Sequence, residues 1–209
     1  MANISKINGF KAVKHVTGAP YNGQANIYAT SASDSTALFV GDPVKLAADG
    51  NAQGIQFVTK ATAGAAVLGV VVGIINTKLD PVAGTMTNGS IALDTPQYRP
   101  ASTAQYVLVA DAPDLLYEVE ACGSSGAAYS FAVADIAQNA DLYVGTGSTT
   151  TGASGCALDM STKNTTATLQ WKIMGVVQRP DNEITGNYTK VLVKVNNQQL
   201  SSGTGTAGL

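Results

Sequence analysis

The side chains of this sequence that can do nucleophilic or metal chemistry are few. There is a single histidine, His15, and there are two cysteines, Cys122 and Cys156, each next to a glycine. A Ser-His-Asp or Cys-His site would have to use His15, which is far along the chain from either cysteine. With one histidine and no Cys-x-x-Cys pair, a structural zinc site is not expected either. We therefore predict no nucleophile and no metal ligand, and two ordinary reduced thiols.

Acidic pairs and glycine turns give the remaining candidate sites. Glu118 and Glu120 would lie on one face of a strand about 7 Å apart, which overlaps the carboxyl separation of inverting glycosidases. Both belong to a polar face, and nothing near them in sequence would separate their pKa values, so a solvated strand edge is expected. Gly145 and Gly147 follow a strand but precede a Ser/Thr run instead of a helix or a phosphate-binding box. Residues 111–114 lack the alternating acids of a calcium loop. The sequence thus predicts neither an enzyme nor a cofactor.

The composition excludes several partners. Lys and Arg number 12 and Asp and Glu 14, which is 12% charged residues against about 25% in ordinary domains. A net charge of −2 gives no electrostatic reason to bind nucleic acid or an anionic membrane. The longest apolar run, residues 65–75, is interrupted by Gly69 and Gly73, so no membrane helix is predicted. The first six residues lack the apolar stretch of a secretory signal, which favours use without export.

The elements that would position any site are predicted to be short strands separated by turns. Apolar runs bounded by Gly, Pro, Asn, Ser and Thr predict strands at 37–40, 44–46, 55–59, 66–75, 106–110, 115–120, 142–144, 169–177 and 190–195. Leu169, Trp171 and Ile173 alternate with polar residues, as in an antiparallel sheet with one apolar face. Residues 129–140 have helical spacing and predict one short helix. The predicted fold class is all-β, a jelly-roll-like β-sandwich with an extended N-terminal arm, a flexible C-terminal tail and little helix.

Composition along the chain suggests three parts. Residues 1–33 contain no acid and would form an N-terminal arm and first strand, which is either solvated or lies on an acidic neighbouring surface. Residues 34–200 would form the sandwich core, with a protruding loop at 76–103 that is rich in Pro, Asn, Thr and Gly. Residues 201–209 are a Gly/Ser/Thr tail that is flexible unless a partner orders it.

A faint internal repeat predicts two similar sheet halves. Three short apolar motifs each occur twice: 38–41 and 142–145, 68–71 and 174–177, and 107–109 and 191–193. Chance is the competing explanation, because the motifs are short.

Four stretches of the sequence resemble a known family. They are 8–23, 40–44, 98–103 and 177–183. Together they resemble the cement, or decoration, proteins on the heads of tailed bacteriophages, in particular those of short-tailed phages that infect Bordetella. The similarity runs from about residue 7 to about residue 200, and it includes no catalytic fingerprint.

The resemblance implies a structural virion protein on the capsid exterior, made in the host bacterial cytoplasm. It implies an HK97-type major capsid protein as partner, and self-association as a dimer or trimer at local symmetry axes. The chain would bind seams between capsomers and stabilise the shell against the pressure of packaged DNA. We expect the contact residues in the arm and in two Arg-Pro turns: Lys6, Phe10, Lys11, Lys14, His15, Tyr98, Arg99, Pro100, Gln178, Arg179, Pro180, Asp181 and Asn182.

Two other function classes stay open. One is a fibre, spike or adhesin module that recognises a host surface ligand. Such a module would need an aromatic-lined groove, whereas Trp171 lies on an apolar strand face and is predicted to be part of the core. A minor capsid or scaffold-like component inside the head is the other alternative. A wall hydrolase ranks last because charged residues are scarce.

Overall fold

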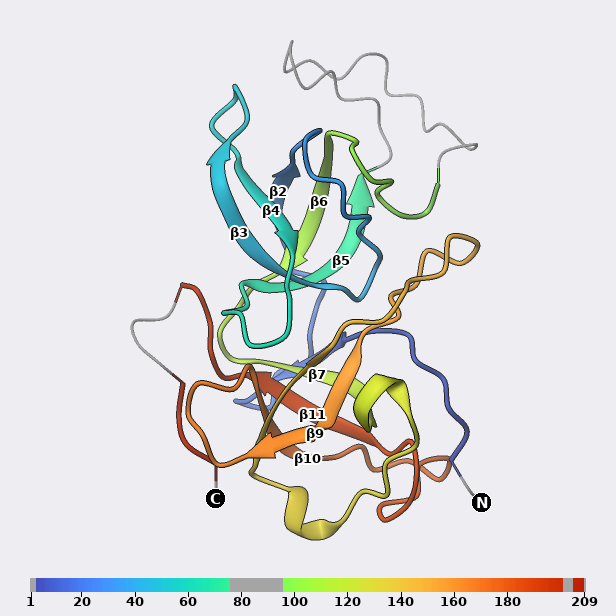
Figure 1. The fold of residues 1–209 in the computed structure, drawn as a ribbon. Coiled ribbons are helices and arrows are strands. Elements are labelled where there is room, and N and C mark those ends of the chain that lie inside the picture. The colour runs from blue at the N-terminus through green and yellow to red at the C-terminus, as the bar shows by residue number, and fades with distance from the viewer. Residues whose placement is uncertain (1–2, 76–95, 201–204, 209) are drawn as a thin grey trace.

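The computed structural model describes residues 3–75, 96–200 and 205–208, which fold almost wholly into β-strands (Figure 1). Helical structure among them consists of two short 3-10 turns, η1 (Ser124–Gly126) and η2 (Val133–Asp135). None of the described helices is long and apolar enough to span a membrane. The predicted all-β fold with little helix is confirmed.

The first barrel takes its five strands from the N-terminal half of the chain. They are β2 (Asn26–Thr30), β3 (Pro43–Gly50), β4 (Gln56–Lys60), β5 (Gly69–Ile75) and β6 (Gln105–Ala110). Their order β2-β4-β3-β5-β6 closes on itself, with β2 and β4 parallel and the other pairs antiparallel. Branched apolar side chains fill its interior: Leu38, Val44, Val58, Leu68, Val71, Val107 and Val109.

The second sheet lies below the first barrel in Figure 1 and takes most of its strands from the C-terminal half. They are β7 (Leu115–Cys122), β8 (Asn139–Tyr143), β9 (Ala157–Asn164), β10 (Trp171–Val176) and β11 (Lys190–Val195). Their order is β7-β11-β10-β8-β9, and β9 pairs back onto β7, so these pairings also form a closed ring. One further strand, β1 (Lys11–His15), adds to the edge of β7.

The two rings have the same topology and the same strand register. In each, the first and third strands are parallel, and the order of strands around the ring is identical. The matching cross-strand pairs are Leu46–Val58 with Leu142–Leu158, Val44–Gly69 with Ala140–Trp171, and Gly73–Leu108 with Gly175–Leu192. The chain is therefore a tandem pair of equivalent five-stranded barrels.

The turn into the second strand of each barrel repeats as well. Gly41 has φ 94° and Ala137 has φ 70°, so both adopt a left-handed conformation, which is costly for alanine. The N–H of Gly41 donates to Val71 O at 2.8 Å, and the N–H of Ala137 donates to Ile173 O at 2.9 Å. The same turn in both barrels supports the predicted duplication. Of the three sequence motifs, only 107–109 and 191–193 occupy equivalent positions; the other two pairs are out of register.

The core of the second barrel is built around Trp171, which is fully buried as predicted. Phe10 stacks on its ring at 4.2 Å between centroids, and Tyr117 meets it edge-on at 5.7 Å. Phe10 comes from the N-terminal segment, so this segment contributes to the core instead of extending away from it.

Buried glutamines tie the two barrels together. Gln170, expected on a polar face, is fully buried and donates to Thr62 O at 2.9 Å and to Ala65 O at 2.7 Å in the first barrel. After β11 the chain returns to the first barrel through a parallel bridge between Val67 and Gln198. These contacts hold the barrels as one body.

The helix predicted over 129–140 is wrong. Only Val133–Asp135 is helical, as a single 3-10 turn. The Asp135 carboxylate accepts hydrogen bonds from Ala132 N–H and Tyr129 O–H, both at 2.9 Å. Such side-chain bonds to nearby groups compete with helix formation, and here they fix an irregular loop over the buried Phe131.

Both chain ends differ from the prediction. Residues 1–33, expected to form an arm and one first strand without stated bounds, contain two strands, β1 and β2. The strand β9 was not predicted, and residues 37–40, predicted as a strand, form only isolated bridges. At the other end, residues 205–208 are held by the chain itself. Asn196 Oδ1 accepts the N–H of Thr206 at 2.8 Å, and Asn139 donates to Thr206 O at 2.8 Å. The expectation that only a partner orders the tail is therefore wrong for these residues. Most of the expected protruding loop, residues 76–95, lies outside the described residues.

Candidate functional site

The residues with the chemistry of catalytic sites are each engaged in structural contacts. His15 Nδ1 lies 3.0 Å from Asp114 Oδ2. Cys122 and Cys156 are fully buried, and burial raises the pKa of each thiol to about 12. Within residues 3–75, 96–200 and 205–208, no three His, Cys, Asp or Glu side chains cluster in a way that would hold a metal ion.

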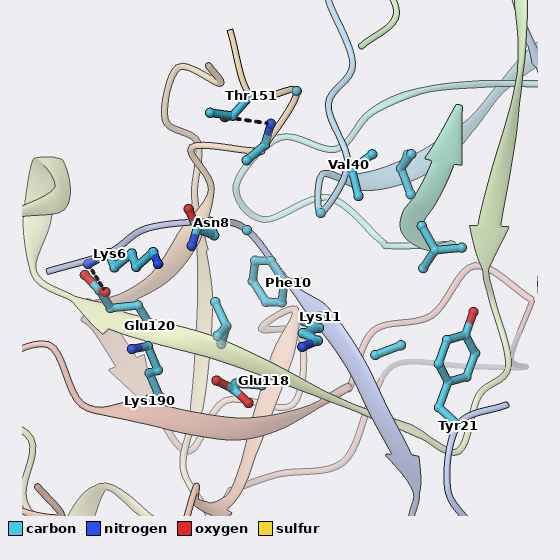
Figure 2. A pocket seen from close by; sticks show the side chains of 18 of the residues that line it. Lys6, Asn8, Phe10, Lys11, Tyr21, Val40, Glu118, Glu120, Thr151 and Lys190 are labelled. Atoms are coloured by element: carbon cyan, nitrogen blue, oxygen red, sulfur yellow. Dashed lines mark hydrogen bonds between the residues drawn. The ribbon is translucent and has the colours of Figure 1, made fainter. Parts of the chain in front are cut away.

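A groove of about 1010 Å³ brings several predicted contact residues together (Figure 2). Its walls are the N-terminal segment at 6–12, β7 at 118–120, and the loops at 40–41 and 151–153. We call it the arm groove. Five of the thirteen predicted contact residues line it: Lys6, Phe10, Lys11, Arg179 and Asp181.

The acids of the arm groove are already paired within the chain. Glu120, only 3% exposed, accepts hydrogen bonds from Ser5 O–H at 3.0 Å and from Lys6 N–H at 2.7 Å. The two carboxylate oxygens of Glu118 accept the two terminal guanidinium nitrogens of Arg179, at 2.9 and 3.1 Å. The two glutamates therefore hold the N-terminal segment and the Arg-Pro turn. The solvated edge expected for them is wrong, because Glu120 is buried and Glu118 is half-buried and paired with Arg179.

The lysines of the arm groove are not paired in the way that its glutamates are. Lys6, Lys11 and Lys190 line it, and none of them makes an ion pair with an acidic residue of the described ranges. Glu118 is paired with Arg179, whereas Glu120 accepts hydrogen bonds from two neutral donors and keeps its negative charge in the same groove. The arm groove therefore carries groups of both signs, which suits contact with polar groups.

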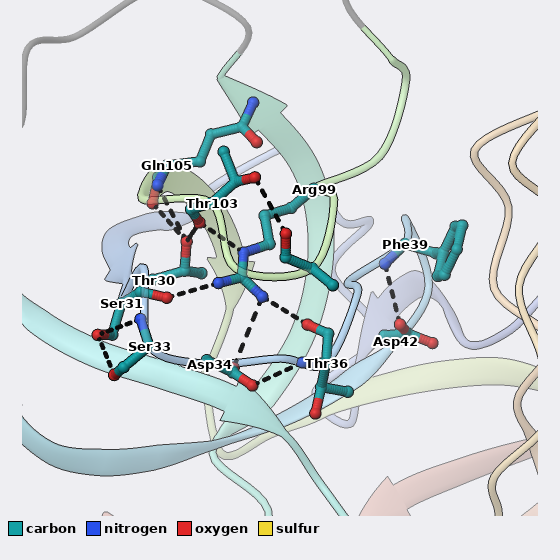
Figure 3. A network of polar contacts seen from close by, with 11 residues as sticks. Thr30, Ser31, Ser33, Asp34, Thr36, Phe39, Asp42, Arg99, Thr103 and Gln105 are labelled. Carbon is teal, nitrogen blue, oxygen red and sulfur yellow. Dashed lines mark hydrogen bonds and ion pairs between the residues drawn. The ribbon is translucent and has the colours of Figure 1, made fainter.

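The turn at Tyr98, Arg99 and Pro100 is not the exposed contact that was predicted, because Tyr98 and Pro100 are half-buried and Arg99 is buried in a network of polar contacts (Figure 3). Arg99 is fully buried in the first barrel, where its guanidinium donates to the carbonyls of Thr103 at 2.7 Å and Ser31 at 2.6 Å, and to that of Thr36. Burial lowers its pKa, while Asp34, 3.7 Å away, opposes that shift. Tyr98 stacks on Phe39 at 4.9 Å. This turn stabilises the barrel.

The remaining predicted residues divide between surface and core. Lys14, Gln178 and Pro180 are exposed, His15 is half-buried, and Phe10 and Asn182 are buried. Asn182 donates to Val177 O at 2.8 Å and to Lys190 O at 2.9 Å, so it fixes the turn that carries Arg179. Phe10 and Asn182 thus support the surface from within.

Sequence reasoning missed a buried polar cluster where the barrels meet. Asp42 and Lys60 come from the first barrel, and Ser154 and Cys156 from the chain leading into β9. Asp42 Oδ1 lies 3.1 Å from Lys60 Nζ and accepts hydrogen bonds from Ser154 at 2.6 Å and Cys156 at 3.3 Å. The only signal was Gly-Asp-Pro at 41–43, which does not reveal partners so distant in sequence.

Comparison of the chain with protein-family models, curated proteins and solved structures finds no match.

Proposed function

We propose that this chain is a structural virion protein that binds the outside of a phage head at seams between capsomers and stabilises the shell. The observation that carries the proposal is the joining of two equivalent barrels into one body by buried polar contacts. A clamp across a seam must transmit force between its two ends, and a rigid body does this better than two domains on a flexible linker.

The surface of this body suits contact with protein. Charged residues are few in the whole chain, and several of them lie in its interior: Asp42, Arg99, Glu120 and Asp135 are all buried. The outer surface therefore carries even less charge than the composition suggests. Covering such a surface requires little removal of water from ions, which favours many modest interfaces repeated over a shell.

The partners follow from this role. We propose an HK97-type major capsid protein beneath the chain, with self-association as a dimer or trimer at local axes. The arm groove, whose three lysines make no ion pair with an acid of the described ranges, is suited to receive a polar segment of the shell protein. Binding at many seams would stabilise the assembled head by mass action, because free subunits lack the composite site.

The test uses heads of the encoding phage assembled without this chain. Purified chain is added, the heads are sedimented, and the temperature of DNA release is measured with and without the chain. We expect hundreds of copies per head to co-sediment and the release temperature to rise. The proposal fails if the chain stays in the supernatant, or if binding leaves release unchanged; a few dozen copies confined to the tail would favour the fibre or spike alternative instead.

A further inference from the structure

Three asparagines of the chain are followed directly by glycine: Asn8, Asn22 and Asn88. An Asn-Gly pair is chemically reactive, because glycine has no side chain to hinder attack by its backbone nitrogen on the neighbouring amide carbon. The attack requires a backbone that can turn until this nitrogen reaches the asparagine side chain. Asn88 lies outside the described residues, and the other two pairs differ in their surroundings.

The Asn8-Gly9 pair is held on both sides. Gly9 has φ 76°, and a Cβ atom there would lie 2.5 Å from Ser154 Cβ and 2.6 Å from Gly41 O. The next residue, Phe10, donates its N–H to Gly41 O at 2.9 Å and stacks on the buried Trp171. Turning this peptide would therefore disturb the packing around Gly9 and pull Phe10 from the core.

The Asn22-Gly23 pair has none of these restraints. Both residues are exposed, and apart from its chain neighbours a Cβ atom on Gly23 would meet nothing within 4 Å. Within the described ranges, neither the Asn22 side chain nor the Gly23 N–H makes a hydrogen bond. One exposed hydrogen bond spans the pair, from Tyr21 O–H to Gln24 O at 3.1 Å. Since the segment outside this bond is irregular and exposed, it can open locally at low cost in free energy.

We propose that Asn22 is a site of spontaneous deamidation in the folded chain. The backbone nitrogen of Gly23 attacks Cγ of Asn22, its proton leaves with the side-chain nitrogen as ammonia, and a five-membered succinimide ring forms. Water then adds to one of the two ring carbonyl carbons that came from Asn22, and the C–N bond at that carbon breaks. The product is aspartate, or isoaspartate in which the main chain runs through the former side chain. The reaction consumes only water and needs no oxidant.

Either product places a carboxylate in a segment that has none. Residues 1–33 contain no Asp or Glu, and Asn22 directly follows Tyr21, which lines the arm groove. One added anion takes the formal net charge of the chain from −2 to −3. Isoaspartate also lengthens the main chain shortly before β2. This inference concerns the isolated chain and does not depend on the proposed function.

Peptide mapping by mass spectrometry tests the site directly. The purified full chain is kept at pH 8, and the peptides that contain each Asn-Gly pair are followed over time. Asn22 is expected to gain one mass unit and to give separate aspartate and isoaspartate peptides. Asn8 should react at least about tenfold more slowly, because its pair must first open. In urea, where both pairs are unfolded, the two rates should become similar. An unmodified Asn22 in the folded chain overturns the proposal, as does an Asn8 that reacts as fast as Asn22 before unfolding.

Two glutamine variants give an independent measurement by ion exchange, which separates the more acidic product. Both are made together with Asn88→Gln, so that the third pair does not contribute. Asn22→Gln would have to form a six-membered ring, which closes far more slowly, so the acidic species should no longer accumulate. Asn8→Gln is the matched control and should leave its accumulation unchanged. Circular dichroism checks that both variants are folded. Undiminished accumulation in folded Asn22→Gln overturns the proposal, as does its loss in folded Asn8→Gln.

Discussion

The amino group of Lys60 lies 3.1 Å from Oδ1 of Asp42, and the two side chains are 9% and 0% exposed. The same oxygen accepts the hydroxyl of Ser154 at 2.6 Å, while Oδ2 accepts the N–H of Phe39 at 2.9 Å. Since Asp42 and Lys60 belong to the first barrel and Ser154 leads into the second, one buried carboxylate joins the two barrels.

Removing this carboxylate should destabilise the whole chain. Asp42→Ala leaves Lys60 buried without its counter-charge, which typically costs about 3–5 kcal/mol. Urea unfolding followed by circular dichroism measures the loss. Asp181→Ala is the control, because it breaks an exposed ion pair with Arg179 worth at most about 1 kcal/mol. Equal losses for the two variants would contradict a special role for the buried pair.

The N-terminal segment should prove part of the core. Phe10→Ala removes a ring that stacks on Trp171, and such truncations cost about 3–5 kcal/mol. The chain has one tryptophan, so its fluorescence should also shift to the red as water reaches the indole. The neighbouring exposed Lys11→Ala should change stability by no more than about 0.5 kcal/mol. If Phe10→Ala changed neither the free energy of unfolding nor the fluorescence, the N-terminal segment would not pack on Trp171 in solution.

The two Arg-Pro turns should respond differently to lysine. Arg99→Lys keeps the charge but cannot reach three carbonyls at once, so buried acceptors lose their donors at a cost of at least about 2 kcal/mol. Arg179→Lys, on the surface, should cost under about 1 kcal/mol. Thermal unfolding distinguishes them, and amide chemical shifts should change at Ser31, Thr36 and Thr103 in the first variant only.

Neither native thiol should react in the folded chain. Burial raises the pKa of Cys122 and Cys156 from 9.0 to about 12, so at pH 8 both stay protonated as well as shielded. Iodoacetamide should label both only after denaturation, as read by intact mass, whereas an added cysteine in Ser148→Cys should label at once. The raised pKa values also make the free energy of unfolding depend on pH. The stability that the two protonated thiols contribute is fully present below pH 9 and is lost as the pH rises toward 12. Rapid labelling of the native chain at pH 8 would contradict the buried placement.

Binding to heads should depend on which end of β11 a lysine occupies. Lys190 and Lys194 lie on the same strand and are both half-buried, but Lys190 lines the arm groove while Lys194 lines a separate hollow. Lys190→Ala is expected to weaken co-sedimentation with heads about tenfold, and Lys194→Ala less than about twofold. The reverse order would place the contact at the other end of the strand, by the hollow that Lys194 lines.

The strands with the longest apolar runs could be predicted from sequence. The runs at 106–110, 115–120 and 190–195 lie within strands or coincide with them, because alternating or continuous branched side chains need a sheet to bury them. Within residues 1–33 one strand was expected, but the bounds of β1 and β2 could not be predicted. Lys11–His15 and Asn26–Thr30 are short and partly polar, and their neighbours in the sheets, not their own composition, make them strands.

The sequence by itself determined the all-β class and the buried Trp171, because periodicity and composition act locally. Of the repeated motifs, only 107–109 and 191–193 proved equivalent, so the duplication was established by the strand register. Only the tertiary structure decided the fate of individual polar residues. Arg99 and Arg179 both precede proline, yet one is sealed in a barrel and the other lies on a groove. The difference lies in acceptors supplied by remote segments, the carbonyls of Ser31 and Thr36 for one and the carboxylate of Glu118 for the other. Such acceptors come together only when the chain has folded. The local sequence pattern therefore cannot show whether a charged side chain is paired inside the molecule or is exposed to a binding partner.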